Sequence, residues 1–356
     1  MQLPRNAQIW LPGYLRSLRR AKFDDSQPVR VFVAIADHFE PLRGDAGLVK
    51  GLERVEPWRK LWPEIAQRHR DAMGRPAQYT FFYPEEEYRP ALLEPLAEMV
   101  HAGFGDVEIH LHHDGEGEQN FIDRISSFKE ALFNRHGLLR MDDSGRVIFG
   151  FIHGNWALDN SRPDGRWCGL NNEITLLREL GCYADFTMPS APSPTQARQV
   201  NAIYWAVDDP AKPKSYDSGP PVSPDPNSGH QGGLLMIPGP LALNWKERSR
   251  GIAPRLEVGE LAAHNPVTPE RVRLWLDYAP RVGNNILVKL FAHGAWEANA
   301  NALLAGDLDR TLLILESATA QRGWQLHFST ASELADVALS REARPRFMPL
   351  RAGCDR

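Results

Sequence analysis

Residues 30–36 read RVFVAIA, a short run of β-branched and apolar residues that predicts a buried strand. Similar runs recur along most of the chain, separated by longer segments whose apolar residues repeat at helical spacing. Strands are expected at 30–36, 78–83, 107–113, 147–153, 184–188, 202–207, 234–237, 286–292 and 324–329, and helices at 52–73, 91–102, 120–136, 171–180, 269–278 and 308–322. Thr268 and Pro269 have the N-cap and first-turn preferences of a helix start. This repeated alternation predicts a parallel sheet covered by helices.

Two architectures fit such an alternation, an open doubly wound sheet and a closed (β/α) barrel. No GxGxxG or GxxxxGK[ST] motif follows the first strand, which argues against the nucleotide-binding form of the open sheet. We therefore expect a single α/β domain over 29–338, a closed (β/α) barrel of seven or eight strands. Residues 1–28 are expected to form a capping segment with a helix that plugs the barrel bottom, and 339–356 a polar tail. The Pro/Gly/Ser-rich loop 212–233 is either an active-site lid or a disordered insert.

The composition is that of an ordinary globular chain: 356 residues, 24% charged and 42% hydrophobic. A net charge of −4 argues against a dedicated nucleic-acid-binding protein, which usually has a basic excess. No stretch approaches the roughly 20 apolar residues of a membrane span, and the N-terminus lacks the apolar core of a secretory signal. Three widely spaced cysteines form neither a disulfide framework nor a CxxC motif. We therefore expect a cytoplasmic protein.

Residues 106–114, DVEIHLHHD, carry the strongest functional signal. Side chains of a strand alternate between its two faces, so the apolar members of this stretch should face the helices. The side chains expected on the interior face are Glu108, His110, His112 and Asp114. Such a polar row makes a poor core, because each buried polar group needs a partner.

Converging imidazoles and carboxylates are good ligands for a divalent transition metal such as zinc. The first strand ends in Asp37-His38, which brings a further acid and imidazole to the same rim. The expected metal ligands are His38, His110 and His112, with His113 and Asp114 available for a fourth position or for contacts with the ligands. The alternative is a hydrogen-bonded polar network that fills the mouth of the barrel.

Two strands end in matching hexapeptides, FIHGNW at 151–156 and FAHGAW at 291–296. Glycine after histidine allows the chain to turn at the rim, and an indole offers an apolar plate to a sugar ring. The residues expected to contact substrate or support the site are Glu108, His113, Asp114, His153, Asn155, Trp156 and Trp296. Alternatively, both tryptophans only cap the edge of the barrel.

These segments resemble the polysaccharide deacetylase (NodB-like, carbohydrate esterase family four) superfamily over about residues 29–336. The family's T-F-D-D motif is matched by the sequence IADH, where Asp37 takes the place of the base and His38 that of a metal-binding Asp. The family's E-I-G-x-H-x-x-x-H motif is similar to EIHLH at 108–112, followed by Glu116 at the place of the second His. The late strand LFAH at 290–293 and the segment up to Leu334 are similar in order and spacing.

The sequence departs from the family at several positions. His38 stands for the metal Asp, the H-x-x-x-H spacing is absent, and Gly294 replaces the Asp that usually follows the late His. The Arg-Pro motif is represented only by residues 161–163, SRP. The resemblance implies a distorted barrel and a metal-dependent carbohydrate deacetylase, which hydrolyses a C–N bond other than a peptide bond, or an ester.

We therefore expect an enzyme that removes an N- or O-acetyl group from a poly- or oligosaccharide, with Asp37 as general base and His293 as general acid. The competing role for His293 is that of a further metal ligand or rim residue. A glycosidase would need two flanking carboxylates, for which the candidates are Asp37 with Asp114 or Glu108. A third possibility is a non-catalytic glycan-binding barrel. The sequence leaves the sugar and the oligomeric state open.

Overall fold

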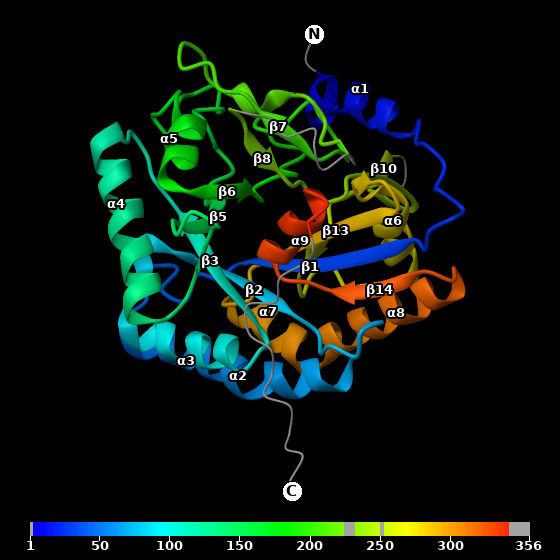
Figure 1. The fold of residues 1–356 in the computed structure, drawn as a ribbon, viewed down its shortest axis with the longest axis horizontal. Helices are drawn as coiled ribbons and strands as arrows, with labels where there is room; N and C mark the ends of the chain where they lie inside the picture. The colour runs from blue at the N-terminus through cyan, green and yellow to red at the C-terminus, as the bar shows by residue number, and fades with distance from the viewer. Residues whose placement is uncertain (1–2, 224–231, 250–252, 342–356) are drawn as a thin grey trace, which may run out of the picture.

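The computed structural model describes residues 3–223, 232–249 and 253–341, and a large, mostly parallel sheet lies at its centre (Figure 1). The strands are β1 (Arg30–His38), β2 (Tyr79–Pro84), β3 (Gly105–Leu111), β4 (Arg140–Met141), β5 (Val147–His153), β6 (Cys182–Asp185), β7 (Tyr204–Ala206), β8 (Leu234–Met236), β9 (Ala242–Ser249), β10 (Ala253–Glu257), β11 (Glu260–Leu261), β12 (Arg281–Val282), β13 (Asn285–Ala292) and β14 (Gln325–Phe328). Their order is β11-β13-β1-β2-β3-β5-β6-β8-β7, with β14 beside β1, β12 beside β13 and β4 beside β5, while β9 and β10 form a separate hairpin.

Most helices cover the outer face of this sheet (Figure 1). The α-helices of the described residues are α1 (Ala7–Ser17), α2 (Leu48–Arg68), α3 (Pro90–His101), α4 (Glu118–Glu130), α5 (Glu173–Leu180), α6 (Pro269–Tyr278), α7 (Glu297–Ala302), α8 (Leu308–Gln321) and α9 (Ala331–Ala338). Strand β1 shows how the core is divided, because its side chains alternate between the two faces. Val31, Val33 and Ile35 point outward into the core that includes Trp58 and Trp62 of α2.

The inner face of the sheet has its own, smaller core. Phe32, Ala34 and Ala36 of β1 belong to it, together with Leu334 and Ala338 of helix α9. Helix α9 therefore occupies the inner side of the sheet, and it begins with a capping box at Thr330. By the same alternation, a side chain at position 38 falls on the inner face and one at position 37 on the outer face.

The predicted α/β class with a mostly parallel central sheet is confirmed. A closed barrel is not shown, because in the described part of the chain no strand pairing joins β7 at one end of the order to β11 at the other. The helix expected at 269–278 is confirmed as α6, and the Thr268 side chain accepts a hydrogen bond from the Arg271 amide as its N-cap. The β9–β10 hairpin was not among the expected strands.

Helix α1, from the segment expected to cap the barrel bottom, packs through Trp10 and Tyr14 against Val200 and Leu241. Helix α9, in contrast, covers the inner face of the sheet. In the loop 212–233, Tyr216 is fully buried, while the other residues described between 212 and 223 are exposed or partly buried. Residues 224–231 of that loop and 342–356 of the expected tail lie outside the described residues.

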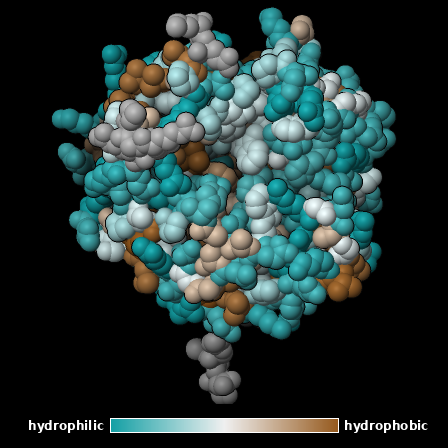
Figure 2. All heavy atoms as spheres, turned by 180° about the vertical axis from the view of Figure 1, so that it is seen from behind, coloured by the Kyte–Doolittle hydropathy of each residue, from teal (hydrophilic) through white to brown (hydrophobic). Residues whose placement is uncertain are grey.

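The surface on the opposite side of the molecule is mostly hydrophilic around a central hollow, with small separate apolar patches (Figure 2). Among the residues that the structure describes, no helix combines the length and apolarity required to cross a membrane.

Candidate metal centre

Three buried side chains meet where β1 and β3 end, on the inner face of the sheet. His38 and Glu40 are two residues apart on β1 and the turn that follows it, and His110 lies on β3. One potential ligand atom from each of the three lies within 4.8 Å of the other two, and His110 Nε2 is 3.4 Å from Glu40 Oε1. We call this group the inner cluster.

The donor set of the inner cluster fits a divalent metal ion. The described protein atoms leave Nδ1 of His38 and both ring nitrogens of His110 without a hydrogen-bond partner, although these atoms are buried. Burial lowers the pKa of both imidazoles, which keeps them neutral. Burial raises the pKa of Glu40, but the adjacent imidazoles, His110 first, outweigh this and hold it at about 2. Two neutral imidazoles and a carboxylate are a common ligand set for zinc.

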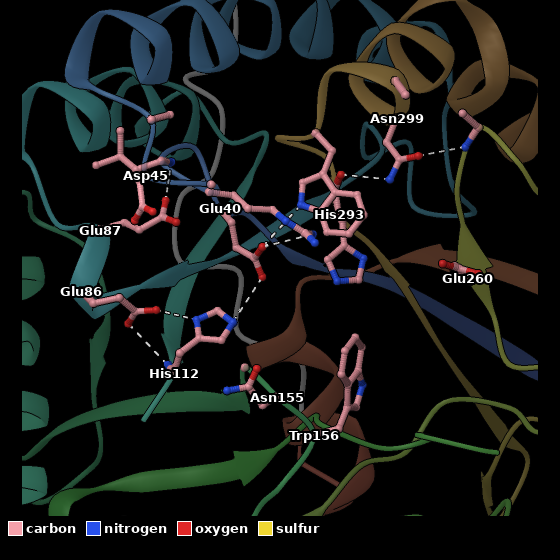
Figure 3. A pocket seen from close by; sticks show the side chains of 18 of the residues that line it. Glu40, Asp45, Glu86, Glu87, His112, Asn155, Trp156, Glu260, His293 and Asn299 are labelled. Carbon is pink, nitrogen blue, oxygen red and sulfur yellow. Dashed lines mark hydrogen bonds and ion pairs between the residues drawn. The ribbon is translucent and has the colours of Figure 1, made fainter. Parts of the chain in front are cut away.

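His112, the third predicted ligand, lies beside the inner cluster and is not a member of it. Its Nε2 is 3.6 Å from Glu40 Oε1, and its Nδ1 is 2.5 Å from Glu86 Oε1 (Figure 3). The contact with Glu86 raises the pKa of His112 above its ordinary value, although burial, the largest effect, opposes this. The His112 ring can take this position because residue 154 is a glycine, since a Cβ at Gly154 would lie 2.3 Å from His112 Cδ2.

Glu40 is the member that was not predicted. The signal was present in the sequence, because residues 38 and 40 are two apart and share a face of an extended chain. Glu86, which orients His112, follows β2 in the acidic run at 85–87 and was also missed. Taken by itself, a run of acidic residues more often indicates a solvent-exposed turn than part of a functional site.

A pocket of about 1010 Å³ adjoins the inner cluster through Glu40. Three of the residues expected to contact substrate line it, namely Asn155, Trp156 and Trp296. Figure 3 shows Asn155 and Trp156. The Trp156 ring centroid is 5.1 Å from that of His38, and the Arg43 guanidinium lies 3.3 Å from the Trp296 ring centroid. The two indoles from β5 and β13 therefore border the same space.

His293 also lines this pocket. Its ring centroid is 4.8 Å from that of His38 and 4.6 Å from that of Trp296. Burial lowers the pKa of His293 to about 4, so it is not the unperturbed imidazole that the sequence-based assignment as general acid required. Its position at the rim beside the inner cluster agrees with the expected convergence of β1 and β13, which pair in parallel.

Asp37 does not face His293 across the cluster, and this part of the prediction was wrong. Its carboxylate lies on the outer face, where Oδ2 accepts from the Tyr79 hydroxyl at 2.9 Å and Oδ1 from the Gly294 amide at 2.7 Å. Burial raises the pKa of Asp37 to about 7. Trp58 Nε1 donates to the Gly294 carbonyl as well. Asp37 therefore fixes the turn after His293, and it does not reach the pocket.

Glu108 and Asp114 are also remote from the pocket. Glu108 faces inward as predicted, but it accepts hydrogen bonds from the Tyr183 hydroxyl and the Gly150 amide. Asp114 does not face the interior, because β3 ends at Leu111 and the Asp114 carboxylate accepts from the Trp167 amide at 2.6 Å.

His113 and His153 form part of a second buried group. Both lie on the outer side of the sheet, with ring centroids 4.7 Å apart, and neither lines the pocket. Their neighbours are Cys168 and Glu173, which with the two histidines could also hold a metal ion. The sequence predicts that His113 and His153 contact substrate or support the site. In the structure both lie away from the pocket, so the geometry does not support this role.

No protein-family model matches this chain, and no curated protein matches it. Its function is therefore inferred from the geometry of these buried groups and the pocket.

Proposed function

We propose that this protein is a metal-dependent hydrolase that removes an N- or O-acyl group from a carbohydrate. The observation that carries the proposal is the inner cluster of His38, Glu40 and His110 beside a pocket bordered by two indoles. Indole faces suit sugar rings, and the many carboxylates and amides of the pocket suit their hydroxyl groups. The order of the deacetylase-like segments along the sequence supports the same reaction class.

His38, Glu40 and His110 would hold the metal ion. A divalent cation at this place would supply Lewis-acid polarisation of the acyl oxygen. Two further imidazoles, His112 and His293, line the pocket next to Glu40 and are in reach of a bound substrate. Acyl hydrolysis needs one group to accept a proton and another to donate one. In this proposal His293 accepts the proton, and His112, oriented by Glu86, donates one.

The proposal includes a deacetylase-type barrel. In support of it, the segment after β8 approaches β13: a Cβ at Gly239 would lie 2.6 Å from the Lys289 carbonyl oxygen. In addition, Lys289 Nζ donates to the Phe186 carbonyl at 2.7 Å, across the inner face. The glycosidase alternative has less support, because the carboxylates that it was assigned do not line the pocket.

The test is acetate release by the purified, zinc-loaded protein from an N-acetylated chitooligosaccharide and from an O-acetylated xylooligosaccharide. We expect release from one of them, loss of activity with a chelator and recovery with zinc. Absence of acetate from both substrates would contradict the proposal. Release of reducing ends would instead identify a glycosidase, and binding without any product would identify a glycan-binding protein.

The pocket assignment predicts that Trp156→Ala weakens oligosaccharide binding several-fold, because the indole offers a sugar ring apolar surface worth roughly 25 cal/mol per Å² that the sugar covers. The thermal unfolding temperature should change little, since Trp156 is only partly buried at the rim. Binding is measured by calorimetry, with Trp245→Ala on the β9 hairpin as control, where the indole is 59% exposed and does not line the pocket. Equal binding by both variants would refute the role of Trp156.

A further inference from the structure

A second group of metal-ligand side chains lies on the outer side of the sheet, behind the ends of β3 and β5. It consists of His113, His153, Cys168 and Glu173, which we call the outer cluster. All four are buried, and one potential ligand atom from each lies within 4.8 Å of the other three. The His113 ring also packs against Phe121 of α4, and Glu173 is the first residue of α5. Helices therefore close this site off from solvent.

Hydrogen bonds leave specific atoms of the outer cluster unpartnered. His113 Nε2 lies 3.1 Å from Glu173 Oε1, while Nδ1 of His113 and Nε2 of His153 are buried with no partner among the described protein atoms. An unpartnered buried polar atom is costly, and each one in a native protein needs an explanation such as an ion.

The Cys168 side chain has hydrogen-bond partners of both kinds: its thiol donates to Glu173 Oε2 at 3.3 Å and to the Leu170 carbonyl at 3.5 Å. The amides of Asn160 and Leu170 point to Sγ at 3.2 and 3.4 Å. The thiol contact places the sulfur next to a second potential metal ligand, the Glu173 carboxylate. The thiolate is the form in which cysteine binds a metal.

The loop between β5 and α5, which contains Cys168, is held in an unusual conformation. Four of its non-glycine residues have left-handed backbone angles, with φ of 53° at Trp156, 53° at Asp159, 49° at Asn160 and 67° at Trp167. Such conformations persist only where the surrounding structure fixes them. The Asp159 amide donates to Glu173 Oε2 at 2.6 Å, which ties the loop to the outer cluster.

We propose that His113, His153, Cys168 and Glu173 bind a structural zinc ion, separate from the inner cluster. Four protein ligands of nitrogen, sulfur and oxygen in a closed site are typical of structural zinc, whereas magnesium and calcium prefer oxygen alone. On binding, a bond forms between zinc and Sγ, and the thiol proton leaves to solvent. The ion binds His153 at the start and Glu173 at the end of the loop 154–172. In this way it positions Asn155 and Trp156 at the pocket.

A cobalt-substituted protein distinguishes this site from the inner cluster, because only the outer cluster contains a cysteine. The full-length chain is produced in cobalt medium, and its absorption spectrum and metal content are measured. We expect an intense sulfur-to-cobalt charge-transfer band in the near ultraviolet. Cys168→Ser should abolish this band and lower the metal content by one equivalent per chain. Cys182→Ser, at a buried cysteine whose thiol donates to the Ala184 carbonyl, should change neither quantity.

Absence of the charge-transfer band from the wild-type protein, or its persistence in Cys168→Ser, would overturn the proposal. Should the serine variant not fold, X-ray absorption of the wild-type zinc protein decides the question, since a bound thiolate places sulfur about 2.3 Å from zinc. A zinc spectrum without sulfur would refute the site. The outcome is independent of the proposed hydrolase activity, which depends on the inner cluster and is measured by acetate release.

Discussion

Replacing His110 by alanine is expected to remove one equivalent of metal per chain and to reduce deacetylation by more than about 100-fold. His110 is fully buried, and its ring is packed against His38 and His112 at centroid distances of 4.9 and 4.6 Å. Loss of a residue that merely orients a metal ligand costs about 10–100-fold in affinity or activity, so loss of a ligand itself should cost more. Metal content is measured by mass spectrometry and turnover by acetate release.

His327→Ala is the matched control for this variant. His327 lies on β14, next to the start of β1, and its ring stacks on Phe32 with a centroid distance of 4.7 Å. It is at the opposite end of the strands from the inner cluster, so metal content and turnover should stay at the wild-type level. Full metal occupancy and normal turnover in His110→Ala would exclude the inner cluster as the active metal site. Persistence of the cobalt charge-transfer band in His110→Ala would show that the outer cluster is intact.

The alternation of side chains along the strands could be predicted from the sequence. In β3, Val107, Ile109 and Leu111 belong to the outer core, while Glu108 and His110 lie on the other face, as the period of two requires. The same rule, applied strictly to β1, separates Asp37 from His38. Asp37 was predicted as the base from its match to a family motif, although the alternation puts its side chain on the outer face of the sheet, away from the inner cluster.

The sequence did not reveal which residues of the loops would join the histidines. Cys168 and Glu173 meet His113 only because the loop after β5 returns to the end of β3, and loop conformations have no periodicity to reveal this. The β9–β10 hairpin contains polar and charged residues and a register shift at Pro254, which obscure the alternation of a strand. The sequence therefore indicated which histidines gather at the strand ends, but not which carboxylates accompany them.

One wall of the pocket is stabilised by a buried ion pair between Arg271 of α6 and Glu257, the last residue of β10. Arg271 is fully buried and donates from Nε to Glu257 Oε2 at 2.7 Å and from Nη2 to Glu257 Oε1 at 2.9 Å. Its guanidinium also donates to the Asn265 and Glu260 carbonyls. These contacts fix residues 257–265, and Glu260 from this segment lines the pocket.

Arg271→Met is therefore expected to lower the free energy of unfolding by about 3–5 kcal/mol, because removal of one partner leaves the Glu257 carboxylate buried without its counter-charge. The change is measured by urea unfolding, with Arg273→Met on the same helix as control. Arg273 is 46% exposed in its pairs with Glu270 and Asp277, so its loss should cost less than about 1 kcal/mol.

Adding Glu257→Leu to Arg271→Met should restore part of the stability by removing the unpaired charge. Recovery stays incomplete, since the Trp275 indole N–H and two backbone carbonyls lose their partners. A cost below about 1 kcal/mol for Arg271→Met would mean that water reaches Glu257 and that the pair does not hold this wall.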